Sequence, residues 1–298
     1  MRSLLGACSL ALALLVTSLA TPAVAGPLPD HDTRGPEPLN PAMAQILREK
    51  RALSDQFALV LDGTGNRNEF EARLAGLLHR VRENPERARG GRPGGVTILA
   101  HDSPGVNLGV AQYPQANTFY CGPGSGQSLL SYLGNSVSAY NSAHSLSQAN
   151  LARIEYFRTD YYGNTPWYTG SGDTYPHPVP TGLNRWRVGA ENGWYVPVAY
   201  PTDLAKYKND LRFDVGHMGL PLMGNMVESA GGIHYNSHPD LNIAHWIVLD
   251  GFADYGDTTW YTDPSANAPS LNWSSAPYNS HPSSAFLSNF LTHRGYVW

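Results

Sequence analysis

The chain has 298 residues, of which 42% are hydrophobic and only 15% are charged, and its formal net charge is -4. The abundance of Gly (30), Pro (23) and Tyr (17) is typical of a loop-rich globular protein with β-structure and excludes a coiled coil or a wholly disordered chain. No long basic stretch is present, so no nucleic-acid partner is expected.

Residues 1–25 have the pattern of a secretory signal peptide. Arg2 supplies a positive start, residues 4–19 form an apolar stretch, and Ala23-Val24-Ala25 resembles a cleavage site. The apolar stretch is short for a membrane span, so a membrane anchor is the less favoured alternative. The sequence therefore predicts a secreted, extracellular protein that has no membrane partner after the signal is cleaved.

The cysteine content of the expected mature protein points to one residue, Cys121. The chain has two cysteines, and Cys8 leaves with the signal peptide, so Cys121 remains alone and cannot form an internal disulfide. A single thiol in an oxidising compartment is either reactive or links a partner. The alternative is a buried Cys that acts as a small apolar side chain.

Two segments precede the main domain. Residues 26–39 are Pro-rich and predicted to be disordered. Residues 40–95 predict a pair of helices followed by an Arg/Gly-rich linker, because Asn40-Pro41 is a good helix start and apolar residues recur at helical spacing in two stretches. The linker offers a cleavable joint, so the pair is either a removable propeptide or a permanent extension.

Residues 96–298 form the largest predicted unit, in which charges become rare and Gly, Asn, Ser and aromatic residues become common. The patterns predict a strand at 96–100, a helix at 122–133, and strands at 245–252 and 258–262. A stretch of aromatic residues between the helix and these strands is expected mainly to pack loops onto the core, with a cleft wall or a sugar site as alternatives. It comprises Tyr161, Tyr162, Trp167, Tyr168, Trp186, Trp194 and Tyr195.

Cys121 stands at the entry to the predicted helix. Pro123 suits the first helical turn and Gly122 leaves space beside the sulfur. The partial positive charge of a helix N-terminus and its unpaired N–H groups favour a thiolate, and the same N–H groups can stabilise an oxyanion. Gln115, six residues upstream, could supply a second oxyanion donor, or it could be an ordinary surface residue.

A base and its orienting residue are predicted from the two late strands. If the turn between them is centred on Asp254, His245 faces Asp263, because both lie nine residues from the centre. Facing side chains of an antiparallel pair share one face about 5 Å apart at Cβ. The carboxylate would then orient the imidazole as in other nucleophile–base–orienter triads, whereas a register slip of one residue would separate the two.

These motifs, in this order, resemble the bacteriocin-leader-peptidase-like branch of the papain-like cysteine peptidases. The resemblance covers about residues 96–298 and rests on Gln115…Cys121-Gly-Pro, His245-Trp-Ile-Val-Leu-Asp-Gly and Tyr-Thr-Asp263-Pro. It implies an α+β fold in which a helix carrying the Cys packs on an antiparallel sheet carrying the His and Asp. It also implies that Cys121 is the nucleophile, His245 the base, Asp263 the orienting residue and Gln115 an oxyanion donor.

One departure from the family pattern concerns the first helical turn. Gly124 and Gly126 stand where the family usually has Ala and other small apolar residues. Each Gly is expected to weaken the helix by up to about 1 kcal/mol relative to Ala.

The predicted function is that of a secreted cysteine peptidase or amidase that hydrolyses a peptide or protein substrate through a thioester. The alternatives are a catalytically silent papain-like binding module and an acyltransferase of transglutaminase type. No cofactor or metal is predicted, because the sequence around the histidines that could suggest zinc reads as a loop. These histidines are His217, His234, His238 and His245. The sequence assigns no substrate-binding residues and leaves the oligomeric state open.

Overall fold

The computed structural model describes residues 39–82, 103–170, 172–187 and 193–298. The expected signal peptide, nearly all of the Pro-rich segment, the linker and the expected strand at 96–100 lie outside these residues. Within the described part of the chain, no helix is both long enough and apolar enough to cross a membrane.

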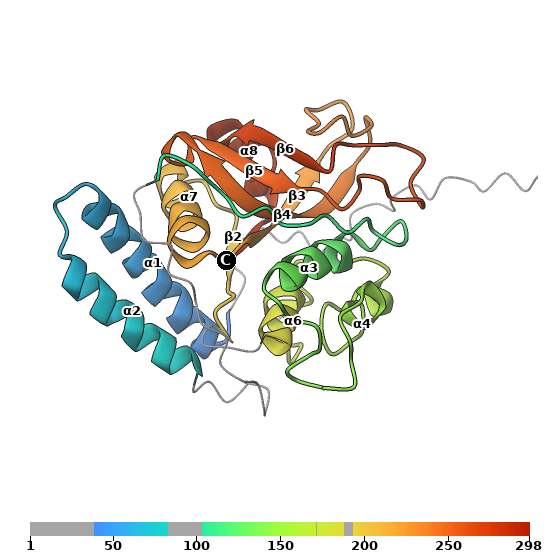
Figure 1. Cartoon of the computed structure of the whole chain (residues 1–298). Coiled ribbons are helices and arrows are strands. Elements are labelled where there is room, and N and C mark those ends of the chain that lie inside the picture. The colour runs from blue at the N-terminus through green and yellow to red at the C-terminus, as the bar shows by residue number, and fades with distance from the viewer. Residues whose placement is uncertain (1–38, 83–102, 171, 188–192) are drawn as a thin grey trace, which may run out of the picture.

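An antiparallel sheet of seven strands forms the centre of the molecule (Figure 1). Its order is β2-β7-β3-β4-β5-β6, and the short strand β1 pairs with the end of β4. The strands are β1 (Val106–Asn107), β2 (Pro197–Ala199), β3 (Leu222–Glu228), β4 (Ile243–Ala253), β5 (Thr258–Thr262), β6 (Tyr278–Pro282) and β7 (Gly295–Val297).

Strand β4 separates two hydrophobic cores. Because alternate side chains of a strand point to opposite faces, Trp246 and Val248 lie in one core, together with residues of α3 and α6, and Ile247 and Leu249 lie in the other. The helices that surround the sheet are α3 (Cys121–Tyr132), α4 (Gln148–Leu151), α5 (Thr159–Tyr162), α6 (Pro178–Trp186), α7 (Leu204–Leu211) and α8 (Ser283–Asn289). Helical segments of other types complete them: the π-helix η1 (Arg212–Met218) and the 3-10 turns η2 (Asp254–Gly256) and η3 (Leu291–His293). The expected α+β fold, with the Cys-bearing helix packed on an antiparallel sheet, is confirmed.

Two further helices, α1 (Pro41–Leu61) and α2 (Arg67–Arg82), lie side by side next to α7 and apart from α3 (Figure 1). Asn40 caps α1 by accepting the backbone N–H of Met43 at 2.8 Å. Leu59 is one of the recurring apolar residues of the first predicted helix, but its side chain is 52% exposed. It lies two residues after the buried Phe57, and two residues along a helix point in clearly different directions.

Helix α1 is anchored to the main core by a buried ion pair. Lys50 Nζ donates to Asp214 Oδ2 at 2.9 Å, and both side chains are fully buried. The same Nζ lies 4.4 Å and 4.2 Å from the ring centroids of Trp194 and Trp298. Burial lowers the pKa of Lys50 to about 8 and raises the pKa of Asp214. The pair therefore joins α1 to η1 in the interior of the fold.

The β4–β5 hairpin has a different register from the expected one, but His245 and Asp263 still lie on the same face. Near the turn Ala253 pairs with Thr258, whereas beyond a bulge at Asp250 the pairing is Val248 with Thr262. The turn lies later than expected, which alone would put His245 and Asp263 on opposite faces. The extra residue of the bulge shifts the register back by one position and returns the two side chains to one face, displaced diagonally instead of directly opposed.

Candidate active site

Cys121 is the first residue of helix α3 and is 8% exposed. The glycines that follow it allow close packing. A Cβ on Gly124 would lie 2.9 Å from Pro264 Cβ, and a Cβ on Gly126 would lie 2.4 Å from Phe157 Cε2. The glycines that depart from the family pattern are therefore required by close packing around the start of α3, next to Asp263 and its neighbour Pro264.

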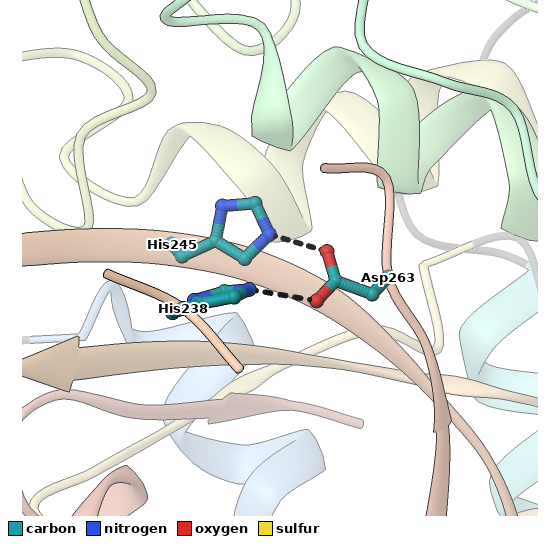
Figure 2. A group of neighbouring side chains, drawn as sticks. All are labelled: His238, His245 and Asp263. Atoms are coloured by element: carbon teal, nitrogen blue, oxygen red, sulfur yellow. Dashed lines mark hydrogen bonds and ion pairs between the residues drawn. The ribbon is translucent and has the colours of Figure 1, made fainter. Parts of the chain in front are cut away.

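His245, near the start of β4, is 4% exposed and binds both proposed partners. Its Nε2 donates to Asp263 Oδ1 at 2.8 Å (Figure 2), and the Cys121 side chain lies near enough to the imidazole to raise its pKa. Burial disfavours the charged imidazolium, but the negative charge of Asp263, its hydrogen bond and the contact with Cys121 outweigh this and raise the pKa of His245 to about 10. The three side chains therefore form one continuous chain.

Helix α3 and strand β4 are held in this arrangement by a hydrogen bond beside the site. Ser125 Oγ, one turn into α3, donates to the backbone carbonyl of Trp246 at 2.9 Å. The indole of Trp246 in turn donates to the carbonyl of Thr165 at 2.9 Å and stacks on Trp167 with ring centroids 5.8 Å apart. The residue next to His245 is thus fixed to the helix that carries Cys121.

Asp263 is fully buried and accepts hydrogen bonds on both oxygens. Oδ1 accepts His245 Nε2 and, at 2.8 Å and 2.6 Å, the N–H and hydroxyl of Ser265. Oδ2 accepts Asn236 Nδ2 at 2.7 Å and His238 Nε2 at 3.0 Å (Figure 2). Burial alone would raise the pKa of this carboxyl, but the positive charge of His245 and the hydrogen bonds hold it well below its usual range.

Gln115 lies beside the first turn of α3, only 2% exposed. Its backbone N–H donates to the Pro264 carbonyl at 2.8 Å, and its Cα would lie 3.5 Å from a Cβ on Gly124. One hydrogen of its side-chain amide is taken by the Asn117 carbonyl at 2.7 Å. Because an amide nitrogen carries two hydrogens, this contact uses only one of them.

The aromatic stretch divides into two groups. Tyr161 and Tyr162 on α5 are 69% and 40% exposed, and Tyr168 is half-buried. The other four side chains are buried in the two cores, as the packing interpretation expected: Trp167, Trp186, Trp194 and Tyr195.

The histidines considered for zinc do not all come together. His217 lies between the rings of Phe57, Phe70 and Phe213, away from the others. In the described part of the chain, the ligand atoms of His238, His245 and Asp263 lie within 4.8 Å of one another, close enough to consider a metal. Both imidazoles donate to the carboxylate between them, so these hydrogen bonds already account for the arrangement, and a metal would have to break them.

The structure thus brings Cys121, His245 and Asp263 together and places Gln115 beside them. Sequence reasoning missed the other partners of Asp263, which lie on irregular loops: Asn236, His238 and Ser265. The only signal for His238 was its spacing from His234, which suggested metal binding instead.

A Cys at a helix N-terminus that meets a His and an Asp on an antiparallel sheet is the arrangement of a papain-like cysteine peptidase. A family model supports this class independently. The Peptidase_C39-like family matches residues 107–290, well over half of the chain, and the chain belongs to that family.

Two further comparisons were made. Among solved structures, the chain is similar to xylellain, a cysteine protease from Xylella fastidiosa, with 13% identity and a TM-score of 0.32 over 71% of this chain and 96% of that one. No curated protein matches the chain.

Proposed function

We propose that this protein is a secreted cysteine peptidase or amidase that hydrolyses peptide bonds through a Cys-His-Asp triad and a thioester intermediate. The observation that supports the proposal is that His245 interacts with both other residues: its Nε2 lies 2.8 Å from Asp263 Oδ1, and the nearby Cys121 raises its pKa. Membership of the Peptidase_C39-like family supports the reaction class. The narrower assignment to the bacteriocin-leader-peptidase branch remains a prediction from the motifs.

In the acylation step, the Cys121 thiolate attacks the carbonyl carbon of the substrate amide. The tetrahedral oxyanion receives hydrogen bonds from the backbone N–H at the start of α3 and from Gln115 Nε2. The C–N bond then breaks, the imidazolium of His245 gives its proton to the departing amine, and a thioester remains on the sulfur.

In the deacylation step, water attacks the thioester carbonyl while His245 accepts its proton. The carbon–sulfur bond breaks, the acid product leaves, and the thiolate and imidazolium are restored. Asp263 keeps its charge throughout and holds the imidazole by its Nε2, so that the opposite side of the ring faces the sulfur.

We also propose that helices α1 and α2 remain in the mature protein after residues 1–25 are removed. Two buried polar contacts from α1 support permanence over removal: Lys50 with Asp214 at 2.9 Å and Ser54 with Asp210 at 2.9 Å. Asp210 is itself held in the main domain, because it accepts the Tyr296 hydroxyl at 2.7 Å. An inhibitory propeptide would cover the thiol, whereas this pair packs beside α7 and apart from α3 (Figure 1).

The test is cleavage of a mixed peptide library by the purified mature protein, with Cys121→Ala as the matched control. We expect new amino termini with the wild type and none with Cys121→Ala. Cleavage that persists in Cys121→Ala would refute the thiol mechanism. Library digestion with an added primary amine separates hydrolysis from transfer, since a transglutaminase-type enzyme would form the amide adduct.

A further inference from the structure

A second histidine lies behind the proposed triad. His238, in the connection between β3 and β4, has a fully buried side chain, and each of its ring nitrogens faces a carboxylate. Nε2 is 3.0 Å from Asp263 Oδ2, and Nδ1 is 3.3 Å from Glu228 Oε2. Ionised carboxylates only accept hydrogen bonds, so this geometry favours a hydrogen on both ring nitrogens, which is the imidazolium form of His238. The Ser265 hydroxyl oxygen also lies 3.3 Å from Nε2.

The surroundings of His238 leave it little freedom to move. Its ring lies against those of Tyr235 and Trp273, with centroids 4.5 Å and 4.6 Å away. Glu228 is held in turn, because Oε1 accepts the Tyr235 N–H and Oε2 accepts His234 Nδ1, both at 3.1 Å. The second imidazole is therefore held at both ring nitrogens and packed against two aromatic rings.

The carboxylates and imidazoles behind the proposed triad alternate in charge. Glu228, His238, Asp263 and His245 form a buried row in which each group touches one of opposite sign. Burial works against the charged form of His238, but its hydrogen bonds to Asp263 and Glu228 outweigh this and raise its pKa. With Oδ2 of Asp263 occupied by His238 and Asn236, Oδ1 is the oxygen presented to His245.

We propose that His238 is a positioning residue, which, clamped between Glu228 and Asp263, holds the Asp263 carboxylate in the orientation that binds His245. The proposal rests on the proposed triad, because it concerns a residue that acts on the reaction only through Asp263. Without His238, the Asp263 and Glu228 carboxylates lose the cation that lies between them, and Asp263 Oδ2 keeps only the Asn236 amide, so Asp263 can rotate away from the base.

The test uses a readout that needs no substrate, the rate at which iodoacetamide alkylates Cys121 in the full mature chain. We expect His238→Ala to slow alkylation on the order of tenfold or more, since a small misplacement of a catalytic group has effects of this size. His238→Gln should recover part of the rate, because its amide can donate to Asp263 Oδ2 in place of Nε2 but carries no charge.

The matched control is His234→Gln. The His234 ring contacts Glu228 and Asp240, on the far side of Glu228 from Asp263, so the alkylation rate of His234→Gln should equal that of the wild type. If thermal unfolding shows that His238→Ala is too unstable to use, Glu228→Gln tests the same arrangement, because Glu228 is the other carboxylate that contacts His238. This variant should also slow alkylation.

The pH dependence of the alkylation rate separates positioning from a structural role. Besides Asp263, the titratable groups around His238 are Glu228, His245 and Tyr235, whose ring packs against the imidazole, with His234 across Glu228. We expect the profile of His238→Ala to shift relative to that of the wild type. Rates and profiles of His238→Ala that equal those of His234→Gln, with only stability reduced, would overturn the inference. A wild-type rate that is insensitive to His245→Gln would instead refute the triad itself.

Discussion

Replacing Lys50 with Met tests whether the helical pair α1–α2 is an integral part of the fold. Lys50 Nζ is hydrogen-bonded to Asp214, and both side chains are fully buried. Lys50→Met keeps the length and apolar stem of the side chain. It leaves the Asp214 carboxylate buried beside the Trp194 indole, which donates at 3.1 Å, and the charge of Arg187, which also opposes the rise in the pKa of Asp214 that burial causes.

The expected loss of stability follows from removing one partner of this buried ion pair. Removing one partner of a buried ion pair costs about 3–5 kcal/mol of the free energy of unfolding. For a domain of about 150–250 residues, each kcal/mol lowers the unfolding midpoint by about 2–4 °C. Lys50→Met is therefore expected to lower the midpoint by about 10 °C, and adding Asp214→Asn should recover part of the loss because the stranded charge is removed.

The matched control is Lys206→Met, which breaks a salt bridge between the same part of the fold and α1. Lys206 Nζ lies 2.5 Å from Asp55 Oδ2, but the two side chains are 37% and 50% exposed. Exposed pairs contribute about 0–1 kcal/mol, so the midpoint should fall by no more than a few degrees. Scanning calorimetry of the mature protein measures both variants. Equal, small shifts for the two would refute the docking of α1 described above.

Three further predictions concern the helix, the bulge and the base. Gly126→Ala should lower the free energy of unfolding by about 1–3 kcal/mol in urea titrations, because its Cβ would meet Phe157. Gly76→Ala in α2, where the nearest atom is 3.5 Å away, should raise it by about 0.5–1 kcal/mol, and the same sign for both would contradict the packing. Burial raises the pKa of Asp250 to about 6, above its unfolded value, so its ionised form destabilises the fold at neutral pH and this effect vanishes in acid. Asp250→Asn should thus stabilise the protein by about 1–3 kcal/mol near pH 7 and not at all below about pH 4, and a loss at neutral pH would contradict it. His245 must be protonated to release the amine, so kcat/KM should persist with rising pH and fall only near its pKa of about 10; a fall near the ordinary value of about 6.5 would contradict this.

The elements around the site could be predicted because their signals are local. The hairpin strands show as apolar runs on either side of a polar turn, and the Gly-Pro after Cys121 is typical of a helix start. Strand β5 has the expected bounds, Thr258–Thr262, and α3 begins one residue before the expected 122, at Cys121 itself. The family motifs supplied the order of the catalytic side chains.

The parts that could not be predicted depend on contacts between distant segments. Nothing in the sequence marks Asp250 as a bulge, yet its carboxylate accepts the Thr262 hydroxyl at 3.0 Å and the bulge sets which face His245 occupies. His238 lies on an irregular loop, so no period places it next to Asp263. The need for Gly126 comes from Phe157, which is more than thirty residues away in the chain.

The central claim is that the imidazole of His245 is a cation held between the Cys121 sulfur and the Asp263 carboxylate. Titration of the His245 ring by NMR, in the wild type and in Cys121→Ala, measures this directly. Because contact with Cys121 contributes to the raised pKa of His245, we expect a value near 10 in the wild type and a clearly lower value in Cys121→Ala. Identical titration curves in the two proteins, or a wild-type pKa near the ordinary value of about 6.5, would contradict the account.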